Sequence, residues 1–407
     1  MWYNDKIREY AEINYKINKI YCDKHNFTLT KSDTILCSNR EPHWERIPLL
    51  LQHFANYDYL IWIDSDAFFY IDSPSIENVI NSHLDKLLIF SGDNDCNSEK
   101  KLTCQINSGF FIVKSCEKSK NILTRWLTDE TLIKSSKLSK PIFGSNKWND
   151  QGVLRIMYDE NIEEIKDNSI IIPYRILQHF KKDDKLKEKI YELTDRPFVF
   201  HSTNGENMIF KNRVKHSKEY YSDILLDINK KYINSEIQIS KDVIRDIVIN
   251  CNQNMKMLVF GLGYDSELWY NITNKNTFFI ENNRKYIELN KNIDINNIIY
   301  HDYKGINVQN SYKLTEKQVE NFKIPTKILD LAPFDIILVD GPNGFDNNCP
   351  GRLLPIYWSS KLLSKKSTII YIDDAIRKLE KMCINKYFLD KPKTYFSDRL
   401  GTIKIII

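Results

Sequence analysis

Two hydrophobic runs in different halves of this chain each end in a polar turn, and the two turns differ in chemistry. The run Tyr59–Ile63 leads into the acidic triplet Asp64-Ser65-Asp66, and the run Met257–Phe260 leads into the glycine turn Gly261-Leu262-Gly263. A strand followed by either turn is a typical beginning of a nucleotide-type site. Because 407 residues exceed what one hydrophobic core usually serves, the sequence predicts two α/β domains, each with its own site.

Hydrophobic periodicity predicts alternating helices and strands in both halves. Residues 5–25 carry apolar positions at helical spacing, and the second half has short β-branched or aromatic runs that predict parallel strands. Those runs are 257–260, 277–280, 335–339 and 367–372, and residues 394–407 predict a terminal hairpin with its turn at 398–401. Residues 218–241 are charged and lack Gly and Pro, so we predict a connecting helix between domains at 1–217 and 242–407.

Composition argues against several other classes of protein. Lys and Arg total 58 against 54 for Asp and Glu, and a net charge of +4 with both signs interspersed argues against a nucleic-acid partner. No hydrophobic run approaches the ~18 residues of a membrane span. The eight cysteines form no Cys-x-x-Cys pair, so we interpret them as reduced thiols. A soluble, cytoplasmic protein is therefore expected.

The acidic triplet offers two carboxylates at a strand-to-loop transition, where both can reach one divalent cation. A hard cation held this way keeps coordination positions for a diphosphate, and it neutralises the charge that develops when a nucleotide-sugar bond breaks. Taken alone, Asp64-Ser65-Asp66 is equally consistent with a turn or a helix cap.

The segments around the triplet resemble the galactosyl- and mannosyltransferase family that includes yeast mannan and galactomannan enzymes and plant xyloglucan xylosyltransferases. The matching segments are His43–Leu49, Tyr57–Ala67, Asn107–Phe111, Asp150–Gly152 and Phe200–His201. The resemblance covers roughly residues 1 to 215. It implies a GT-A-type fold, a UDP- or GDP-linked sugar donor, an oligosaccharide or polysaccharide acceptor, Mn²⁺ or Mg²⁺, and retention of the anomeric configuration.

The resemblance also implies roles for individual residues. The metal ligands would be Asp64, Asp66 and His201, and Arg46 would contact the diphosphate. The donor sugar would face Asn107, Ser108 and Gly109. The catalytic candidates that line the sugar and acceptor pocket would be Asp150 and Gln151. A strand-end histidine, a turn and a helix cap are the alternative interpretations of His201, Asn107–Gly109 and Asp150-Gln151.

Two segments depart from the family pattern. The strand that normally precedes a segment like Met1–Asp5, and that touches the nucleotide base, is almost absent here. Residues 202–207 lack the basic residue that related enzymes often keep for phosphate, and Lys211 or Arg213 is the expected substitute.

The glycine turn in the second half favours a different cofactor. A Gly-x-Gly turn lets the backbone approach a nucleotide, and an acidic residue closing the next strand can bind both ribose hydroxyls; Gly261, Gly263 and Glu281 meet these conditions. Ser266 stands where a dinucleotide fingerprint has its third glycine. We therefore predict a Rossmann-like domain that binds S-adenosylmethionine through this turn, Ser266 and Glu281.

The second half resembles the plant glucuronoxylan 4-O-methyltransferase family over about residues 242 to 390. The matching segments are Val259–Ser266 with Trp269, Phe279–Glu281, Val339–Gly344, Pro350–Arg352, Ile356-Tyr357 and Ile372–Asp374 with Arg377. The resemblance implies a class I fold and S-adenosylmethionine-dependent O-methylation of a sugar hydroxyl. Tyr264 and Asp373 stand where the family usually has histidine.

Methylation requires that the sugar hydroxyl lose its proton, so a carboxylate near the strand ends is needed as a base. Asp340 is the first candidate, Asp374 the second and Asp373 a third. Alternatively, two carboxylates at neighbouring strand ends share a second divalent metal. Arg352 is predicted to hold an acidic group of the acceptor, or else to form a loop salt bridge.

Together, the two resemblances predict a bifunctional glycan-modifying enzyme that adds a sugar and methylates that sugar or a neighbour. A large DNA virus that builds glycans in its host's cytoplasm, or a microbe with AT-rich DNA, would account for the Lys-, Asn- and Ile-rich composition. The alternative is a polysaccharide O-methyltransferase whose N-terminal half is a non-catalytic glycan-binding domain.

Overall fold

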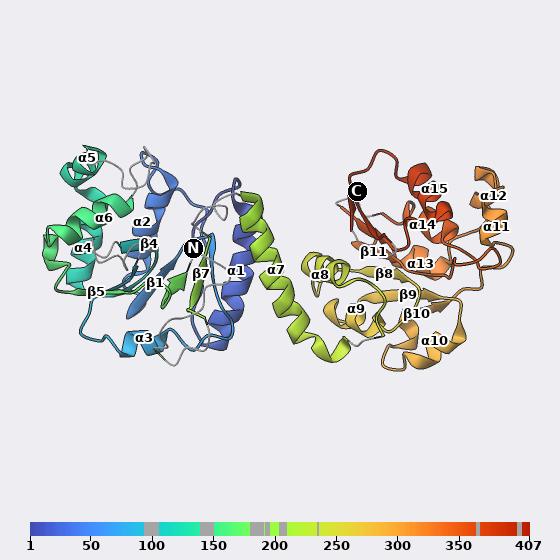
Figure 1. Cartoon of the computed structure of the whole chain (residues 1–407), viewed down its shortest axis with the longest axis horizontal. Helices are drawn as coiled ribbons and strands as arrows, with labels where there is room; N and C mark the ends of the chain where they lie inside the picture. Colours follow the sequence, from blue (N-terminus) through green and yellow to red (C-terminus); the bar gives the residue numbers. More distant parts are fainter. Residues whose placement is uncertain are drawn as a thin grey trace. The chain divides into compact units, whose positions relative to one another are not determined.

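The computed structural model describes residues 1–92, 106–138, 150–179, 191, 196–202, 210–233, 236–363, 367–396 and 401–407. The chain divides into two compact units, Met1–Tyr221 and Ser222–Ile407 (Figure 1). Both units are α/β, so the predicted fold class is confirmed. Residues 398–400 of the predicted terminal turn, together with Cys96 and Cys104, lie outside the described residues.

The first unit is built on a four-stranded sheet with the order β1-β4-β3-β5. The strands are β1 (Tyr59–Ile63), β3 (Leu88–Gly92), β4 (Ile106–Lys114) and β5 (Ser169–Ile172). All pairs are antiparallel except β3 with β5. Side chains of β1 alternate between two hydrophobic cores, with Leu60 and Trp62 facing one core and Ile63 facing the other.

Helices cover one face of this sheet, and a small second sheet lies against the other. The helices of this unit are α1 (Arg8–Lys24), α2 (Arg46–His53), α3 (Glu77–Asn81), α4 (Glu117–Thr128), α5 (Glu130–Leu138) and α6 (Asp150–Asp159), with 3₁₀ turns at Pro42–Glu45 and Ile162–Glu164. Helices α2, α4 and α6 share one core with the sheet. The second sheet, with the order β2-β7-β6, contains β2 (Ala67–Phe69), β6 (Gln178–His179) and β7 (Val199–His201), and α1 packs on β2.

The edge of β1 away from β4 is open among the described residues. Met1–Tyr3 forms only an isolated bridge, between Trp2 and Ser32, rather than a strand beside β1. A cavity of about 410 Å³ lies along this edge, lined by Tyr59–Ile63 on one side and Thr28–Ser32 on the other. Among the described residues, β1 is therefore an edge strand of its sheet.

The second unit contains a seven-stranded sheet with the order β10-β9-β8-β11-β12-β14-β13. The strands are β8 (Met257–Phe260), β9 (Thr277–Glu281), β10 (Ile298–Tyr300), β11 (Ile336–Val339), β12 (Ile369–Ile372), β13 (Lys393–Tyr395) and β14 (Ile403–Ile406). The first five in this order are parallel, and β14 pairs antiparallel with β12 and β13. The predicted parallel strands and the terminal antiparallel pair are thus present.

Helices cover both faces of this sheet, and its central strands β8 and β11 are accordingly buried at every residue. Met257 and Val259 of β8 face one core with α8 and α9, whereas Leu258 and Phe260 face another core with α14 and α15. The helices are α8 (Lys241–Asn250), α9 (Ser266–Ile272), α10 (Arg284–Leu289), α11 (Val308–Ser311), α12 (Glu316–Glu320), α13 (Thr326–Leu331), α14 (Leu353–Ser359) and α15 (Lys378–Tyr387), with 3₁₀ turns at Lys230–Tyr232 and Ile295–Asn297.

A single helix, α7 (Phe210–Ile228), contains the boundary between the two units. Figure 1 shows its first half beside α1, where Val214 packs with Tyr10. Near its other end, Leu225 and Leu226 pack against the core of the second unit. The predicted connecting helix at 218–241 is wrong at both ends, since α7 begins at Phe210 and ends at Ile228; charge and the absence of Gly and Pro do not mark where a helix starts or ends.

Membrane-spanning helices and disulfides were also considered for the described residues. Among them, no helix has both the length and the apolar character that crossing a membrane requires. The six described cysteines form no disulfide.

Candidate functional site

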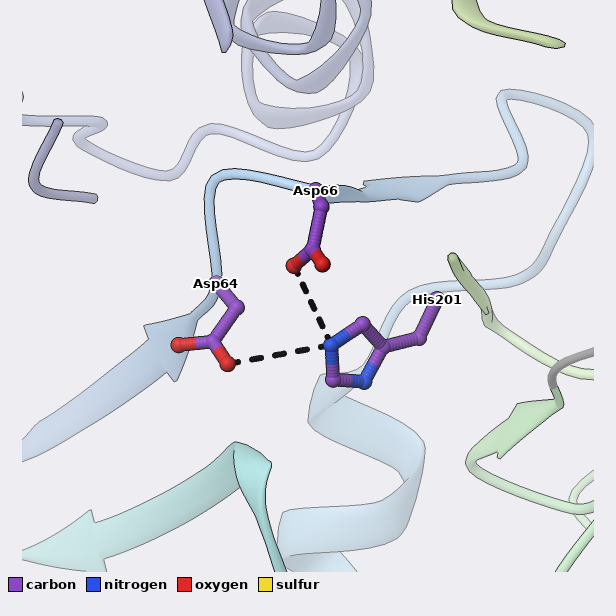
Figure 2. Close-up of side chains that lie close together, drawn as sticks. All are labelled: Asp64, Asp66 and His201. Atoms are coloured by element: carbon purple, nitrogen blue, oxygen red, sulfur yellow. Dashed lines mark ion pairs between the residues drawn. The ribbon is translucent and has the colours of Figure 1, made fainter. Parts of the chain in front are cut away.

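Strand pairing brings Asp64, Asp66 and His201 together in the first unit. Asp64 follows β1, Asp66 precedes β2, and β2 pairs with β7 so that Ala67 lies opposite His201. The imidazole Nε2 is 3.2 Å from Asp66 Oδ1 and 3.7 Å from Asp64 Oδ2 (Figure 2). One ligand atom from each residue lies within 4.8 Å of the others, and among the described residues this is the one such group. Two carboxylates and an imidazole are a donor set that fits Mn²⁺ or Mg²⁺.

Helix α1 holds the turn that carries both carboxylates. Asn14 donates its side-chain amide to the Ser65 carbonyl (2.9 Å), and Asn18 donates to the Ala67 carbonyl (3.2 Å) while accepting from the Phe69 amide (2.8 Å). Both asparagines are almost completely buried. The two asparagines are four residues apart and lie on an otherwise apolar face of the helix. This spacing is a signal that the sequence contained and that sequence reasoning missed.

Arg213 of α7 sets the charge around Asp66. Its guanidinium lies 2.9 Å from Asp66 Oδ2 and also donates to the Ser202 carbonyl (3.0 Å). Burial by itself raises the pKa of Asp66, but His201 and Arg213 together outweigh it and hold that pKa below its ordinary value. Of the two basic residues considered as substitutes, Arg213 is therefore at the cluster, whereas Lys211 is exposed.

Gly109 of β4 lies directly against the cluster. A Cβ at this position would be 2.0 Å from His201 Cε1 and 2.9 Å from Asp64 Oδ2. The Gly109 carbonyl accepts from the Asp64 amide (2.8 Å), and the Asn107 side chain accepts from the Gly109 amide (2.9 Å). The close packing of β4 against the ligands thus depends on the absence of a side chain at 109.

A buried arginine links the cluster to the other predicted residues. Arg46 lies 3.1 Å from Asp150 Oδ2 and 3.4 Å from Asp64 Oδ1, and it donates to the carbonyl and hydroxyl of Ser108. Gln151 accepts from the Ser108 amide (2.8 Å). Burial, opposed by Arg46 and reinforced by Asp64, raises the pKa of Asp150 to about 6. Arg46 thus compensates two carboxylates of the protein, and its contact with a diphosphate stays a prediction.

The glycine turn of the second unit is assembled around Glu281. Gly261 has φ 108°, which favours glycine, and a Cβ there would lie 3.1 Å from the Gly341 backbone nitrogen. Glu281 at the end of β9 accepts from the Leu262 amide (2.7 Å), and the Ser266 hydroxyl accepts from the Gly263 amide (2.8 Å). Burial raises the pKa of Glu281, although backbone amides oppose this. The four predicted cofactor residues are therefore neighbours.

Arg352 lies at the ends of β11 and β12, where three aspartates meet. Its guanidinium is 2.7 Å from Asp374 Oδ2, 3.4 Å from Asp340 Oδ1 and 3.6 Å from Asp373 Oδ2. Arg377 also pairs with Asp374, at 2.8 Å. The Asp374 side chain is only 3% exposed, whereas that of Asp340 is 33% exposed. Asp374 thus forms ion pairs with two arginines, whereas Asp340 is the carboxylate that is accessible to a substrate.

Asp340 holds its proton unusually tightly for a carboxylic acid. Burial raises its pKa to about 8; Arg352 opposes this shift, and the negative charges of Asp265 and Asp373 reinforce it. Asp265, which sequence reasoning did not single out, accepts a hydrogen bond from the Trp269 indole (2.6 Å). A carboxyl group with such a pKa can accept a proton in the range where enzymes usually work.

Comparison with known proteins places the first site in a family. Residues 3–208, half of the 407-residue chain, match the galactosyl transferase GMA12/MNN10 family. The chain belongs to this family. The cluster Asp64–Asp66–His201 and the network around Arg46 both fall within the matched range, and the resemblance predicted for the N-terminal half is confirmed.

Relatives of this GMA12/MNN10-family chain also include plant proteins, some of which are named for methyl transfer. "Glucuronoxylan 4-O-methyltransferase 2" of Arabidopsis thaliana is 29% identical over 167 residues, which are 36% of this chain and 56% of that protein. "Protein IRX15-LIKE" of the same plant is 26% identical over 170 residues, 35% of this chain and 53% of that protein. The chain thus spans about half the length of these curated relatives. The resemblance predicted for the second half is confirmed.

Among solved structures, the GMA12/MNN10-family chain is similar to a glycosyltransferase involved in the glycosylation of the major capsid of PBCV-1. The TM-score is 0.38 at 14% identity, over 54% of this chain and 96% of that one.

Proposed function

We propose that this chain transfers a sugar from a nucleotide-linked donor at the Asp64–Asp66–His201 cluster and methylates a sugar hydroxyl at the Gly261–Glu281 turn. The convergence of two carboxylates and one imidazole within 4.8 Å, inside the part of the chain that belongs to a glycosyltransferase family, is the observation that carries the proposal. The relatives of the second half, and its seven-stranded sheet with a glycine turn, support the methyl transfer.

In glycosyl transfer, Asp64, Asp66 and His201 would hold Mn²⁺ or Mg²⁺. When bound, the cation stabilises the negative charge that develops on the departing nucleotide diphosphate. Arg213 contacts Asp66 Oδ2, the carboxylate oxygen that does not face His201. In this position its guanidinium can add positive charge for the diphosphate. Arg46 keeps Asp64 and Asp150 in place, and Gln151 fixes the backbone at Ser108 beside the donor sugar. We also propose that the transferred sugar retains its anomeric configuration.

Donor cleavage is expected to depend on Asp64. With Mn²⁺ and a panel of UDP- and GDP-sugars, the wild-type chain should release nucleotide diphosphate from one donor, and Asp64→Asn should lower that rate by about 100-fold or more. Asp85→Asn removes an exposed carboxylate of the same unit and should leave the rate unchanged. If no donor gives nucleotide diphosphate release, either with or without oligosaccharide acceptors, the result would count against sugar transfer and favour a glycan-binding N-terminal unit.

In methyl transfer, Asp340 receives the proton of the acceptor hydroxyl. S-adenosylmethionine would supply the methyl group: a bond from the hydroxyl oxygen to the methyl carbon would replace the carbon–sulfur bond, whose electron pair would stay on the sulfur of S-adenosylhomocysteine. Glu281 is placed for the ribose hydroxyls, and the Gly261 backbone lets the cofactor approach β8. Arg352 holds Asp340 and its neighbours at the strand ends.

Methyl transfer is expected to accelerate as the pH rises towards 8. Because the pKa of Asp340 is raised to about 8, the carboxylate that acts as base is scarce at pH 6, and the rate should rise about tenfold per pH unit until it levels off. Asp340→Asn should lower the plateau by about 10²- to 10⁴-fold, whereas Asp330→Asn, on the surface of α13, should not. Transfer of labelled methyl groups to glucuronoxylan and other oligosaccharides between pH 6 and 9 provides the measurement. A flat profile with an active Asp340→Asn variant would remove Asp340 from the mechanism.

A further inference from the structure

Gln178 lies directly behind His201, on the side away from the carboxylates. It belongs to β6, which pairs with β7 so that Gln178 lies beside Val199 and His179 beside Phe200. Its side chain is completely buried. Gln178 Oε1 lies 3.0 Å from His201 Nδ1. The buried amide of Gln178 is thus within hydrogen-bonding distance of the imidazole of the candidate metal cluster.

This contact determines which ring nitrogen carries the proton. An amide oxygen can only accept a hydrogen bond, so His201 Nδ1 must be the donor, and in the neutral ring Nε2 keeps its lone pair. Nε2 is the atom that faces Asp66 Oδ1 and Asp64 Oδ2. A lone pair and two carboxylate oxygens that converge on one position form an arrangement that suits a divalent cation, and Arg213 and Arg46 contact these two carboxylates from other sides.

We propose that Gln178 is a positioning residue that fixes His201 in the tautomer and orientation in which Nε2 binds a divalent cation. The proposal rests on the proposed function of the Asp64–Asp66–His201 cluster. Residues that hydrogen-bond the second nitrogen of a metal-binding histidine fix its tautomer, and their loss typically lowers metal affinity by about 10–100-fold.

The same small sheet contains a matched control. Tyr70 and His179 form a similar buried hydrogen bond, with Tyr70 Oη 2.9 Å from His179 Nε2. His179 is adjacent to Gln178 in the chain but is not one of the three residues of the cluster. Tyr70→Phe therefore removes one buried hydrogen bond from this sheet without removing the one to His201.

The experiment is a Mn²⁺ titration of the full chain, followed by the electron paramagnetic resonance signal of the free ion. Gln178→Met preserves the volume of the side chain and removes the acceptor, so it should weaken Mn²⁺ binding by about 10–100-fold. Gln178→Glu keeps an oxygen that accepts from Nδ1 and should bind Mn²⁺ within a few-fold of wild type. Tyr70→Phe should also bind as wild type does. Wild-type affinity in Gln178→Met, or an equally weak Gln178→Glu variant, would overturn the proposal.

Two further results separate this proposal from the proposed function. If the wild-type chain binds no Mn²⁺, the metal cluster and the role of Gln178 both fail. If wild type binds Mn²⁺ and Gln178→Met does not, but no donor is cleaved, only the sugar transfer fails. Should Gln178→Met not fold, the ¹⁵N chemical shifts of His201 in the wild-type chain still decide, because a proton on Nε2 instead of Nδ1 would contradict the proposed tautomer.

Discussion

Replacement of Gly109 by alanine is expected to lower Mn²⁺ affinity by about 100-fold or more, since displacing a ligand costs more than losing a residue behind it. The new methyl group would lie 2.0 Å from His201 Cε1 and 2.8 Å from His201 Nδ1. Strand β4 cannot easily retreat, because it pairs with β1 on one side and β3 on the other. His201 must therefore rotate, which breaks its contact with Gln178 and moves Nε2 away from the carboxylates. Mn²⁺ titration and donor cleavage measure the effect.

The control for this substitution must weaken the same strand without touching the cluster. Val113→Ala does so, because Val113 is completely buried in β4 and contributes to the helix-covered core. It should cost about 1–3 kcal/mol of unfolding free energy and leave Mn²⁺ affinity unchanged. A Gly109→Ala variant that binds Mn²⁺ as tightly as wild type would show that the cluster tolerates a displaced imidazole, and that its geometry does not define the site.

The second large effect is expected from Arg352→Met. This substitution should lower the unfolding free energy of the second unit by about 3–5 kcal/mol, because it leaves buried carboxylates without their main counter-charge. Arg352 is itself buried, and its guanidinium contacts Asp340, Asp373 and Asp374. Methyl transfer should be lost as well, because the Asp340 and Asp373 carbonyls lose their donor. Urea unfolding monitored by circular dichroism gives the change in stability.

Arg245→Met provides the comparison for a partly exposed arginine in the same unit, with a side chain that is 29% exposed. Arg245 pairs with Asp223 and Asp242, both largely exposed, so its loss should change stability by less than about 1 kcal/mol. If Arg352→Met is no more destabilising than Arg245→Met and only raises the KM for the acceptor, then Arg352 binds substrate and is not a structural ion-pair partner.

Local sequence patterns sufficed to predict most of the strands and the residues that follow them. Asp64, Glu281 and Asp340 were recognisable because each follows a short hydrophobic run, and such runs predict strands whose ends carry sites. The meeting of Asp66 with His201 depends on the register between β2 and β7, two strands of three residues each. Strands this short leave little periodicity, so the family resemblance, rather than pattern, connected these residues.

The remaining residues of the sites were hidden for two physical reasons. Gln178 is a polar residue whose partner is a ring atom far away in sequence, and composition carries no trace of such a contact. Arg46 was predicted to contact a diphosphate, and Arg352 to hold either an acidic group of the acceptor or a salt bridge; both are buried among the protein's own carboxylates. An arginine indicates that an anion is nearby, but residue type does not say whether the anion belongs to substrate or protein.

Helix α7 determines where the polypeptide can be divided for separate expression. The helix contributes Arg213 to the metal cluster and Leu225 and Leu226 to the core of the second unit. A cut between Tyr221 and Ser222 would truncate one continuous helix and leave a frayed end on both products. Fragments that overlap, one ending at Ile228 and the other beginning at Phe210, would each keep the entire helix. The two proposed activities are therefore best assayed apart on polypeptides that share these nineteen residues.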